Sequence, residues 1–505
     1  MTLNELLLAE SAVALRRRIG SKEISPVELL EACIERIERI NPAVNAVTAV
    51  CYDRARKEAK AAEKAALHGE PLGLLHGLPT GIKDLDETGG LLTTFGSPLY
   101  RDFVPERDNA MVARVRGAGA IVVGKTNVPE FGAGANSRNL VWGATGNPFD
   151  PMLNAGGSSG GSAVALACDM LPVCTGSDTG GSLRIPAAKC GVVGFRPSPG
   201  LVPVERRSLG WTPISVVGPM GRTVADTALL MAAQAAMDDC DPLSYPVDAR
   251  SFAIPEPRDL GALRVACTED FGISPVDSPI RKVFRDKIQT MRHLFRSCDD
   301  VAFDQFTDAD RCFDVIRAQN YAARYRDAYE KDPNSLGPNV RANYEIAAGM
   351  TLGDVASAHT EQTRIFRRFQ QTFRDYDLVL APTTPVSPFP WNQLYLAEMD
   401  GKRLRNYYHW LSLTYVITLA TNPAISIPCG TDHKSMPFGL QVVGPFRADR
   451  ALLGAAHAME QAFAALPSLR RPLPDLTRLT QPTPALKSIV THPPKAGTPM
   501  AASAV

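Results

Sequence analysis

Two glycine-framed serine segments constrain this chain more than any other feature of its sequence. The first reads Gly-Gly-Ser-Ser-Gly-Gly-Ser over residues 156–162, and the second reads Gly-Ser-Asp-Thr-Gly-Gly-Ser over residues 176–182. Between them lie an Ala/Val/Leu run and the segment Leu-Pro-Val-Cys-Thr, which predict one buried helix and one short strand. Glycines beside a serine permit backbone turns with positive φ and let a bound molecule approach closely. The rest of the chain is therefore expected to support this helix and strand.

The second segment has the composition of a nucleophile loop. Ser182 ends it, and the successive backbone N–H groups of residues 179–182 can converge on one anion. A serine nucleophile needs a base, and the eight histidines stand in no recognisable relation to these segments. Lys83, in Leu-Pro-Thr-Gly-Ile-Lys-Asp, can take that role, because burial at the end of an apolar strand lowers the pKa of an amine.

Other interpretations of the same residues are open. Ser158 and Ser159 can simply cap the helix that follows them, and Lys83 can be an exposed strand end. Residues 119–126 formally match a phosphate-binding loop, but Ala-Ile-Val-Val inside the match is itself the predicted strand. Residues 156–160 match the Gly-x-Ser-x-Gly elbow, but turn-forming residues precede them where that elbow requires a strand.

Three motifs together resemble the amidase signature family: Gly-Ile-Lys-Asp around Lys83, the serine segment around Ser158, and Gly-Ser-Asp-Thr-Gly-Gly-Ser-Leu-Arg-Ile-Pro-Ala around Ser182. The resemblance covers about residues 29–473. It implies an α/β fold in one large domain, with a mixed, twisted β-sheet flanked by α-helices on both faces. It also implies that Ser182 is the nucleophile and that Lys83 is the base. Ser158, which is joined to Gly157 by a cis peptide bond, would bridge the nucleophile and the base.

The resemblance extends to further residues of the site. Asp178 and Arg184 are expected to pair and to brace the serine loop. No metal or organic cofactor is expected. The resemblance implies that the oxyanion donors are Thr179, Gly180, Gly181 and Ser182. It implies that the substrate-binding residues are Phe131, Gly132 and Ser159.

The expected activity is hydrolysis of amides, with carbamates and esters as further substrates. The resemblance is to bacterial amidases and aryl acylamidases rather than to the glutaminase subunit of a transfer-RNA-dependent amidotransferase. Such subunits carry Asn-Leu-Ala-Arg-Tyr-Asp-Gly, where this chain has Ala-Gln-Asn-Tyr-Ala-Ala-Arg-Tyr-Arg-Asp-Ala from residue 318. A non-catalytic binding module is a third alternative, which the intact Lys-Ser-Ser set disfavours. Trp211, Tyr321 and Tyr415 are aromatic candidates for the pocket wall, with core packing as the competing role.

Composition limits the class of protein and its partners. The 505 residues are 45% hydrophobic and 21% charged, which supports a large core. A formal net charge of +1 gives no reason to expect nucleic acid as a partner. The expected partner is a small-molecule amide substrate, and a homodimer is one alternative for the assembly. Ten scattered cysteines without a Cys-x-x-Cys pair indicate reduced thiols and a cytoplasmic protein, and no transmembrane segment is expected.

The predicted organisation follows these patterns along the chain. Residues 1–70 form a helical segment, and residues 71–240 form the core with the catalytic residues. Residues 241–377 are expected to be helical and to cover the mouth of the site. Residues 378–475 supply further core strands and a helix, and residues 476–505, which lose periodicity and are rich in proline, form a disordered tail.

Overall fold

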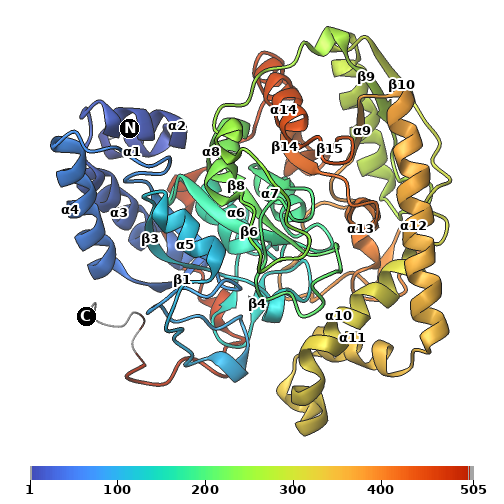
Figure 1. The fold of residues 1–505 in the computed structure, drawn as a ribbon, viewed down its shortest axis with the longest axis horizontal. Helices are drawn as coiled ribbons and strands as arrows, with labels where there is room; N and C mark the ends of the chain where they lie inside the picture. The colour runs from blue at the N-terminus through green and yellow to red at the C-terminus, as the bar shows by residue number, and fades with distance from the viewer. Residues whose placement is uncertain (1–2, 499, 501–505) are drawn as a thin grey trace.

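A mixed sheet of eleven strands forms the centre of the molecule (Figure 1). The structure is a computed structural model that describes residues 3–498 and 500. Helices cover both faces of this sheet, which confirms the predicted fold class. The strands in their order across the sheet are β1 (Val47–Val50), β3 (Ile121–Thr126), β2 (Pro79–Lys83), β6 (Val173–Asp178), β8 (Val216–Gly221), β7 (Val193–Arg196), β14 (Ala424–Thr431), β15 (Pro437–Val443), β11 (Leu378–Pro382), β9 (Arg264–Cys267) and β10 (Ser297–Asp300).

Strand directions divide the sheet into three parts. β2 runs parallel to both β3 and β6, and β9 runs parallel to both β10 and β11. The strands between these groups pair antiparallel, including the hairpin of β14 and β15, and β1 pairs antiparallel with β3 at one edge of the sheet. Two short two-stranded ladders lie outside the sheet, formed by β4 (Arg138–Asn139) with β5 (Gly143–Ala144) and by β12 (Glu398–Met399) with β13 (Lys402–Arg403).

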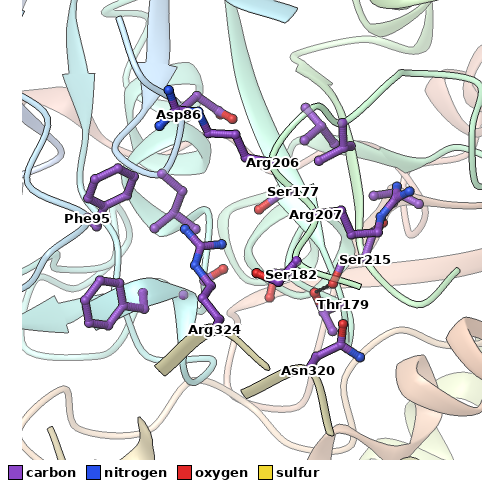
Figure 2. A pocket seen from close by; sticks show the side chains of 18 of the residues that line it. Asp86, Phe95, Ser177, Thr179, Ser182, Arg206, Arg207, Ser215, Asn320 and Arg324 are labelled. Carbon is purple, nitrogen blue, oxygen red and sulfur yellow. Dashed lines mark hydrogen bonds between the residues drawn. The ribbon is translucent and has the colours of Figure 1, made fainter. Parts of the chain in front are cut away.

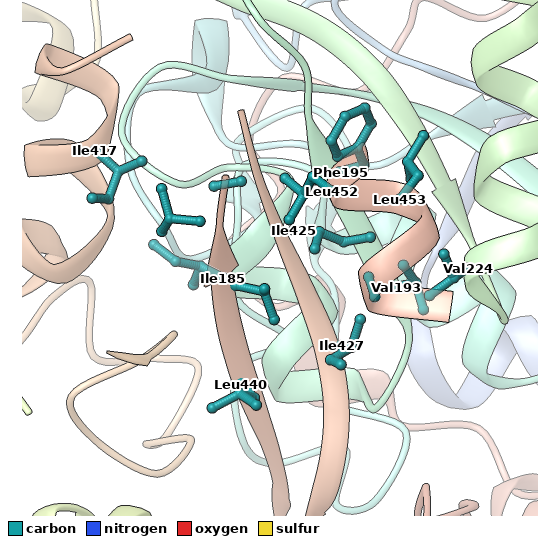
Figure 3. Packing of buried hydrophobic residues seen from close by; sticks show 14 of the residues in the cluster. Ile185, Val193, Phe195, Val224, Ile417, Ile425, Ile427, Leu440, Leu452 and Leu453 are labelled. Atoms are coloured by element: carbon teal, nitrogen blue, oxygen red, sulfur yellow. The ribbon is translucent and has the colours of Figure 1, made fainter. Parts of the chain in front are cut away.

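Hydrophobic cores lie on both faces of the sheet. In β3, Val122 belongs to one buried cluster while Ile121 and Val123 belong to another, as expected when successive side chains point to opposite faces. Figure 3 shows part of the first cluster, with Val193 of β7 and Ile425 of β14 packed in the same core as α14. The helices are α1 (Leu3–Ala9), α2 (Ala12–Gly20), α3 (Pro26–Val44), α4 (Tyr52–Leu67), α5 (Ala110–Gly117), α6 (Gly160–Ala167), α7 (Arg184–Cys190), α8 (Val224–Gln234), α9 (Ser278–Met291), α10 (Ala309–Lys331), α11 (Pro338–Ala348), α12 (Leu352–Asp375), α13 (Ser412–Leu419) and α14 (Asp449–Ala464).

The helix and strand between the two serine segments lie at the middle of the fold. All eight residues of α6 are buried, and the helix packs against β6 and α7. α8 packs on β8, and it also contacts α14, which lies against β14. The long helices α10, α11 and α12 pack together on one side of the molecule, coloured yellow to orange in Figure 1. Two strands, β9 and β10, fall inside residues 241–377, the region that the sequence predicted to be helical.

The C-terminal segment differs from the predicted disordered tail. Residues 476–498 include two short 3₁₀ turns, and Leu479 and Leu486 within them are buried. The backbone N–H of Thr483 donates to the Pro42 carbonyl at 3.1 Å, which fastens the segment to α3. The prediction is wrong here because isolated leucines fill gaps in the core without any periodic pattern. Residues 499 and 501–505 of the predicted tail lie outside the described part of the chain.

Candidate active site

Lys83 is the last residue of β2, at the carboxyl edge of the parallel part of the sheet. Because β2 and β6 are adjacent and parallel, their carboxyl ends lie side by side. The Lys83 backbone N–H donates to Thr175 Oγ1 at 2.9 Å, and its Nζ donates to Ser177 Oγ at 2.9 Å. The Lys83 side chain is fully buried, and the pairing of β2 with β6 places its amine beside Ser177.

Two serines of the first segment complete the surroundings of this amine. Lys83 Nζ lies 2.8 Å from Ser158 Oγ and 2.7 Å from Ser159 Oγ. The peptide bond between Gly157 and Ser158 is cis, as the resemblance implied. A neutral amine has two N–H donors and one lone pair, so it can donate to two of its three hydroxyl neighbours and accept from the third. Lys83 is therefore placed to exchange a proton with a serine.

The environment of Lys83 also sets its charge. Burial lowers the pKa of Lys83 to about 7, and the carboxylates of Asp86 and Asp178 only partly oppose this by favouring the ammonium form. Near neutral pH a large fraction of this amine is therefore uncharged, whereas a free lysine titrates near ~10.4.

A buried carboxylate braces the second serine segment. Asp178 accepts hydrogen bonds from the backbone N–H groups of Gly181 at 2.9 Å and Leu183 at 3.2 Å. Its predicted partner Arg184 donates to the same carboxylate at 2.9 Å and 3.0 Å, and Arg196 adds a third cationic contact. Burial raises the pKa of Asp178, but the two guanidinium groups lower it more strongly, so the pKa lies below its ordinary value. The loop is thus held by an ionised carboxylate.

Ser182 has a hydroxyl that is free to react. Among residues 3–498 and 500, none forms a hydrogen bond with Ser182 Oγ. Its carbonyl accepts from the Ser159 N–H at 3.2 Å, which ties the two serine segments together. From the C-terminal half of the chain, Thr414 Oγ1 donates to the Gly180 carbonyl at 2.6 Å. The nucleophile candidate is consequently fixed through its backbone and left open at its side chain.

The expected oxyanion donors are not all available. The N–H of Gly181 is already bonded to Asp178, so its predicted role as a donor is wrong in this arrangement. Within the described chain, no acceptor engages the N–H groups of Thr179, Gly180 and Ser182. The physical reason is the turn that places Asp178 inside the loop, where its carboxylate takes one of the four donors. Three donors remain.

Ser158 and Ser182 line one cavity of about 480 Å³ (Figure 2). Predicted substrate-binding residues Phe131 and Gly132 line it as well. Gly132 has φ +72°, and a Cβ at this position would lie 3.3 Å from Ser158 Oγ and 2.9 Å from a Leu85 methyl group. A glycine is therefore needed for the backbone to approach Ser158 this closely.

Other predicted pocket residues lie elsewhere. Ser159, expected to bind substrate, is fully buried behind the cavity, where its hydroxyl contacts Lys83 instead. Tyr321 does line the cavity, whereas Trp211 is 78% exposed and outside it, and Tyr415 is buried in the core, stacked on Phe313. Trp211 and Tyr415 are therefore wrong as wall candidates.

Sequence reasoning missed two groups of residues. Ser177 falls within the predicted loop, but it lies in β6 and contacts the Lys83 amine. One face of α10 also lines the cavity, and the signal that could have found it is helical spacing. Its lining residues recur at intervals of three and four positions: Arg317, Asn320, Tyr321, Arg324, Tyr325 and Ala328.

Three further observations concern the described residues as a whole. Residues 3–498 and 500 contain no group of three His, Cys, Asp or Glu side chains placed to hold a metal ion. No helix in that part of the chain is long and apolar enough to cross a membrane. All ten cysteines are free thiols, and only Cys240 is exposed.

Comparison with known proteins identifies the family. The family model described as Amidase matches residues 28–453. One component of the glutamyl-tRNA(Gln) amidotransferase of Acaryochloris marina is 34% identical over 477 residues, which is 90% of this chain and 98% of that protein. An acylamidase of Rhodococcus erythropolis is 32% identical over 455 residues, 89% of this chain and 94% of that protein.

The solved structure of a bacterial aryl acylamidase, an amidase signature enzyme, resembles this one with a TM-score of 0.83. It is 27% identical and the match covers 95% of this chain and 98% of that one. The expected preference for acylamidases over the amidotransferase component is not confirmed, because relatives of both kinds match to a similar extent. Family model, relatives and fold agree across most of the sequence, and on these grounds the chain belongs to the amidase signature family of carbon–nitrogen hydrolases.

Proposed function

We propose that this protein hydrolyses the carbon–nitrogen bond of linear amides through an acyl-enzyme on Ser182, with Ser158 as the bridging group and Lys83 as the general base. One observation carries the proposal. A buried amine with a pKa of about 7 is hydrogen-bonded to Ser158, and Ser158 and Ser182 line the same cavity. A base with a pKa near the working pH is the most effective one for proton transfer.

The first chemical step forms the acyl-enzyme. Neutral Lys83 accepts the proton of Ser158 while Ser158 accepts that of Ser182, and Ser182 Oγ attacks the amide carbonyl carbon. The negative charge that develops on the carbonyl oxygen is stabilised by the free N–H groups of Thr179, Gly180 and Ser182 itself. The proton then returns through Ser158 to the nitrogen, the carbon–nitrogen bond breaks, and the amine leaves.

The second step releases the acid. Water attacks the ester on Ser182, giving one proton to the same relay, and the Ser182 oxygen leaves and recovers its proton. The products are one amine and one carboxylic acid for each water consumed. The relay consists of side chains only, and carbamates and esters fit the same sequence of steps because each presents a carbonyl with a leaving group.

A second candidate function is the glutaminase subunit of a transfer-RNA-dependent amidotransferase. The 34% identity to a component of such an enzyme from Acaryochloris marina, over nearly its full length, favours it. In that function the amide would be glutamine, and the ammonia would pass to a partner. The absence of the run Asn-Leu-Ala-Arg-Tyr-Asp-Gly from α10 weighs against it.

Purified protein without any partner separates these functions. We expect it to hydrolyse anilides faster than glutamine, and we expect Ser182→Ala to lose all but a small remainder of that activity, since the nucleophile is irreplaceable. A fluorophosphonate probe should label the wild type and not the variant. Glutamine as the best substrate would favour the second candidate, and labelling of Ser182→Ala, or more than a tenth of the turnover, would refute the assignment of Ser182.

A further inference from the structure

We propose that the amide cleaved in this cavity carries a carboxylate, which Arg324 of α10 binds, with Arg317 supplying further positive charge. This inference rests on the proposed function and specifies its substrate. Arg317, Asn320, Tyr321 and Arg324 lie on one face of α10, because helix positions separated by three, four and seven residues project to the same side. That face forms one wall of the cavity that holds Ser182.

Arg324 is a cation without a carboxylate partner. It is exposed, it forms no hydrogen bond or ion pair with any residue of the described chain, and its guanidinium carbon lies 5.6 Å from the centre of the Tyr325 ring. Figure 2 shows its side chain extending from α10 over the cavity, between Phe95 and Ser182. A guanidinium in this position can donate two parallel hydrogen bonds to a planar carboxylate.

Arg317 adds charge from deeper in the same wall. It is only 6% exposed, and it donates to the neutral side chains of Asn343, Tyr407 and Tyr321. Its Nη1 has no hydrogen-bond partner among the described residues, and no carboxylate there lies within 4 Å of it. The neighbouring aromatic rings lower the free-energy cost of burying this cation, but they do not neutralise its charge.

Of the other charged side chains that line the cavity, Glu87, Arg206 and Arg207 form ion pairs, whereas the Asp86 carboxyl accepts a hydrogen bond from Asn109 at 3.4 Å and burial raises its pKa. Arg206 forms an ion pair with Glu87 and approaches Glu205 at 3.6 Å, and Arg207 pairs with Asp241 at 2.7 Å. The cavity therefore keeps an excess of positive charge at α10 alone. An anionic group entering the cavity is attracted to that wall and not to the opposite one.

The wall facing α10 indicates what joins the carboxylate to the amide. Phe95, Tyr100 and Phe131 form a continuous ring cluster there, with centroids 5.0 to 6.4 Å apart, and Phe131 reaches Tyr325 at 4.7 Å. Aromatic walls favour a flat or apolar body. The substrate class is thus an aryl or alkyl amide that carries a carboxylate away from the bond to be cleaved.

Matched substrate pairs test this inference. One pair is glutaranilic acid and hexananilide, and the other is 4-acetamidobenzoate and 4-methylacetanilide, so the carboxylate lies on the acyl side in the first and on the amine side in the second. We expect the carboxylate member of at least one pair to have a kcat/KM at least tenfold higher than its neutral partner. In Arg324→Leu that ratio should fall about 10- to 100-fold, as loss of a charge-assisted hydrogen bond predicts.

Two variants control for structural effects. Arg324→Lys should restore part of the ratio, because it keeps the charge and loses the fork of donors. Arg326→Leu, which changes an exposed arginine of the same helix that does not line the cavity, should keep the wild-type ratio. Equal rates for both members of both pairs, or the same loss in Arg326→Leu, would overturn the inference while leaving amide hydrolysis intact.

Binding separates this inference from the proposed function. Calorimetric titration of Ser182→Ala with glutaranilic acid and with 4-acetamidobenzoate needs no turnover. We expect at least one carboxylate to bind at least tenfold more tightly than its neutral partner, and the additional Arg324→Leu change to abolish the difference. If the wild type cleaves none of the four amides but the difference in affinity is present, the proposed amide hydrolysis is refuted and the carboxylate site is supported. If the difference in affinity is absent, the carboxylate site is refuted.

Discussion

At the scale of single residues, the candidate site is arranged as three hydroxyl groups around one amine. Lys83 Nζ contacts Ser158, Ser159 and Ser177 at 2.7 to 2.9 Å. Ser159 and Ser177 also contact each other, since the Ser177 N–H donates to Ser159 Oγ at 3.3 Å. Two hydroxyls can thus hold the N–H groups of the neutral amine and direct its lone pair at Ser158.

The pH dependence of activity should report the charge of Lys83. Its ammonium form cannot accept a proton, so kcat/KM for an amide should be small below pH 7, rise through about pH 7, and then level off. Far below the pKa, the slope should be about tenfold per pH unit. Lys83→Met should remove this rise along with nearly all amide hydrolysis. A wild-type profile that is flat from pH 5 to 9 would show that the base lies elsewhere.

The variant Ser177→Ala tests the pKa of Lys83 more directly in the same pH measurement. Ser177 Oγ accepts a hydrogen bond that is stronger when Lys83 is charged, so its loss disfavours the ammonium and lowers the pKa of Lys83 further. The rise of kcat/KM should therefore move to lower pH. A purely structural role for Ser177 would reduce the plateau and leave the midpoint in place.

The sequence predicted Lys83, Ser158 and Ser182 as site residues from their local motifs, but it did not predict how they are supported. In the structure Lys83 Nζ contacts Ser158, and Ser158 and Ser182 line the same cavity. Ser159 and Ser177 could not be assigned correctly, since which hydroxyls face the amine depends on the pairing of β2 with β6. The hydrogen bond from the Gly181 N–H to Asp178 depends on the turn geometry of the loop. The residue types alone do not determine that geometry.

At the scale of elements, the unit formed by β6, the serine loop and α7 is held by ion pairs that are out of contact with water. Asp178, Arg184 and Arg196 all have fully buried side chains. Arg184 also donates to the Thr414 carbonyl at 3.0 Å and to Gln441 Oε1 at 2.6 Å, which links α7 to α13 and β15. The loop that carries Ser182 is therefore braced from two parts of the chain.

Removing the charge of Asp178 should destabilise the whole protein. In Asp178→Asn two buried guanidinium groups lose their counter-ion, and we expect the free energy of unfolding to fall by about 3–5 kcal/mol. Chemical denaturation measures this. The control is Asp377→Asn, whose partner Arg264 and own side chain are 38% and 36% exposed, so the loss there should be about 0–1 kcal/mol. Similar losses in both variants would contradict the bracing role of Asp178.

Elements with strong local signals were predicted well, and elements that depend on distant partners were not. Ser-Pro-Val-Glu at residues 25–28 predicts a capping box, which does begin α3, whereas Asn41-Pro42 predicts the end of the helix and α3 continues to Val44. A proline removes one N–H donor, and packing of the final turn can offset that loss. β10, with the sequence Ser-Cys-Asp-Asp, has no apolar pattern and exists because it pairs with β9.

At the scale of the whole molecule, the C-terminal segment, residues 476–498, packs against the N-terminal half of the chain. Leu486 is 1% exposed and packs with Ala144 and Trp391. Farther along, the Lys495 N–H donates to Asp102 Oδ1 at 2.7 Å. Composition predicted disorder because the average over this segment is polar and proline-rich, while the docking depends on single side chains.

Truncating one of these leucines tests the docking. Leu486→Ala should lower the free energy of unfolding by about 2–5 kcal/mol, as for other buried leucines. Leu473→Ala is the matched control, because Leu473 is 71% exposed and should change stability by no more than about 0.5 kcal/mol. Thermal unfolding of the full chain measures both, and an unchanged melting temperature in Leu486→Ala would show that the segment is dispensable.

The order of the strands in the sheet also determines when each strand can pair with its neighbours during translation. β7 pairs with β8 on one side and with β14 on the other, and β14 is translated more than two hundred residues later. At roughly 5–20 residues per second, a ribosome leaves that edge of β7 without its neighbour for about 10–45 s. Thr414 and Gln441, which brace the serine loop, emerge in the same late interval. Limited proteolysis of ribosome-arrested chains should therefore cut near β7 until residue 443 has left the exit tunnel, and the loop around Ser182 acquires its fixed shape only near the end of translation.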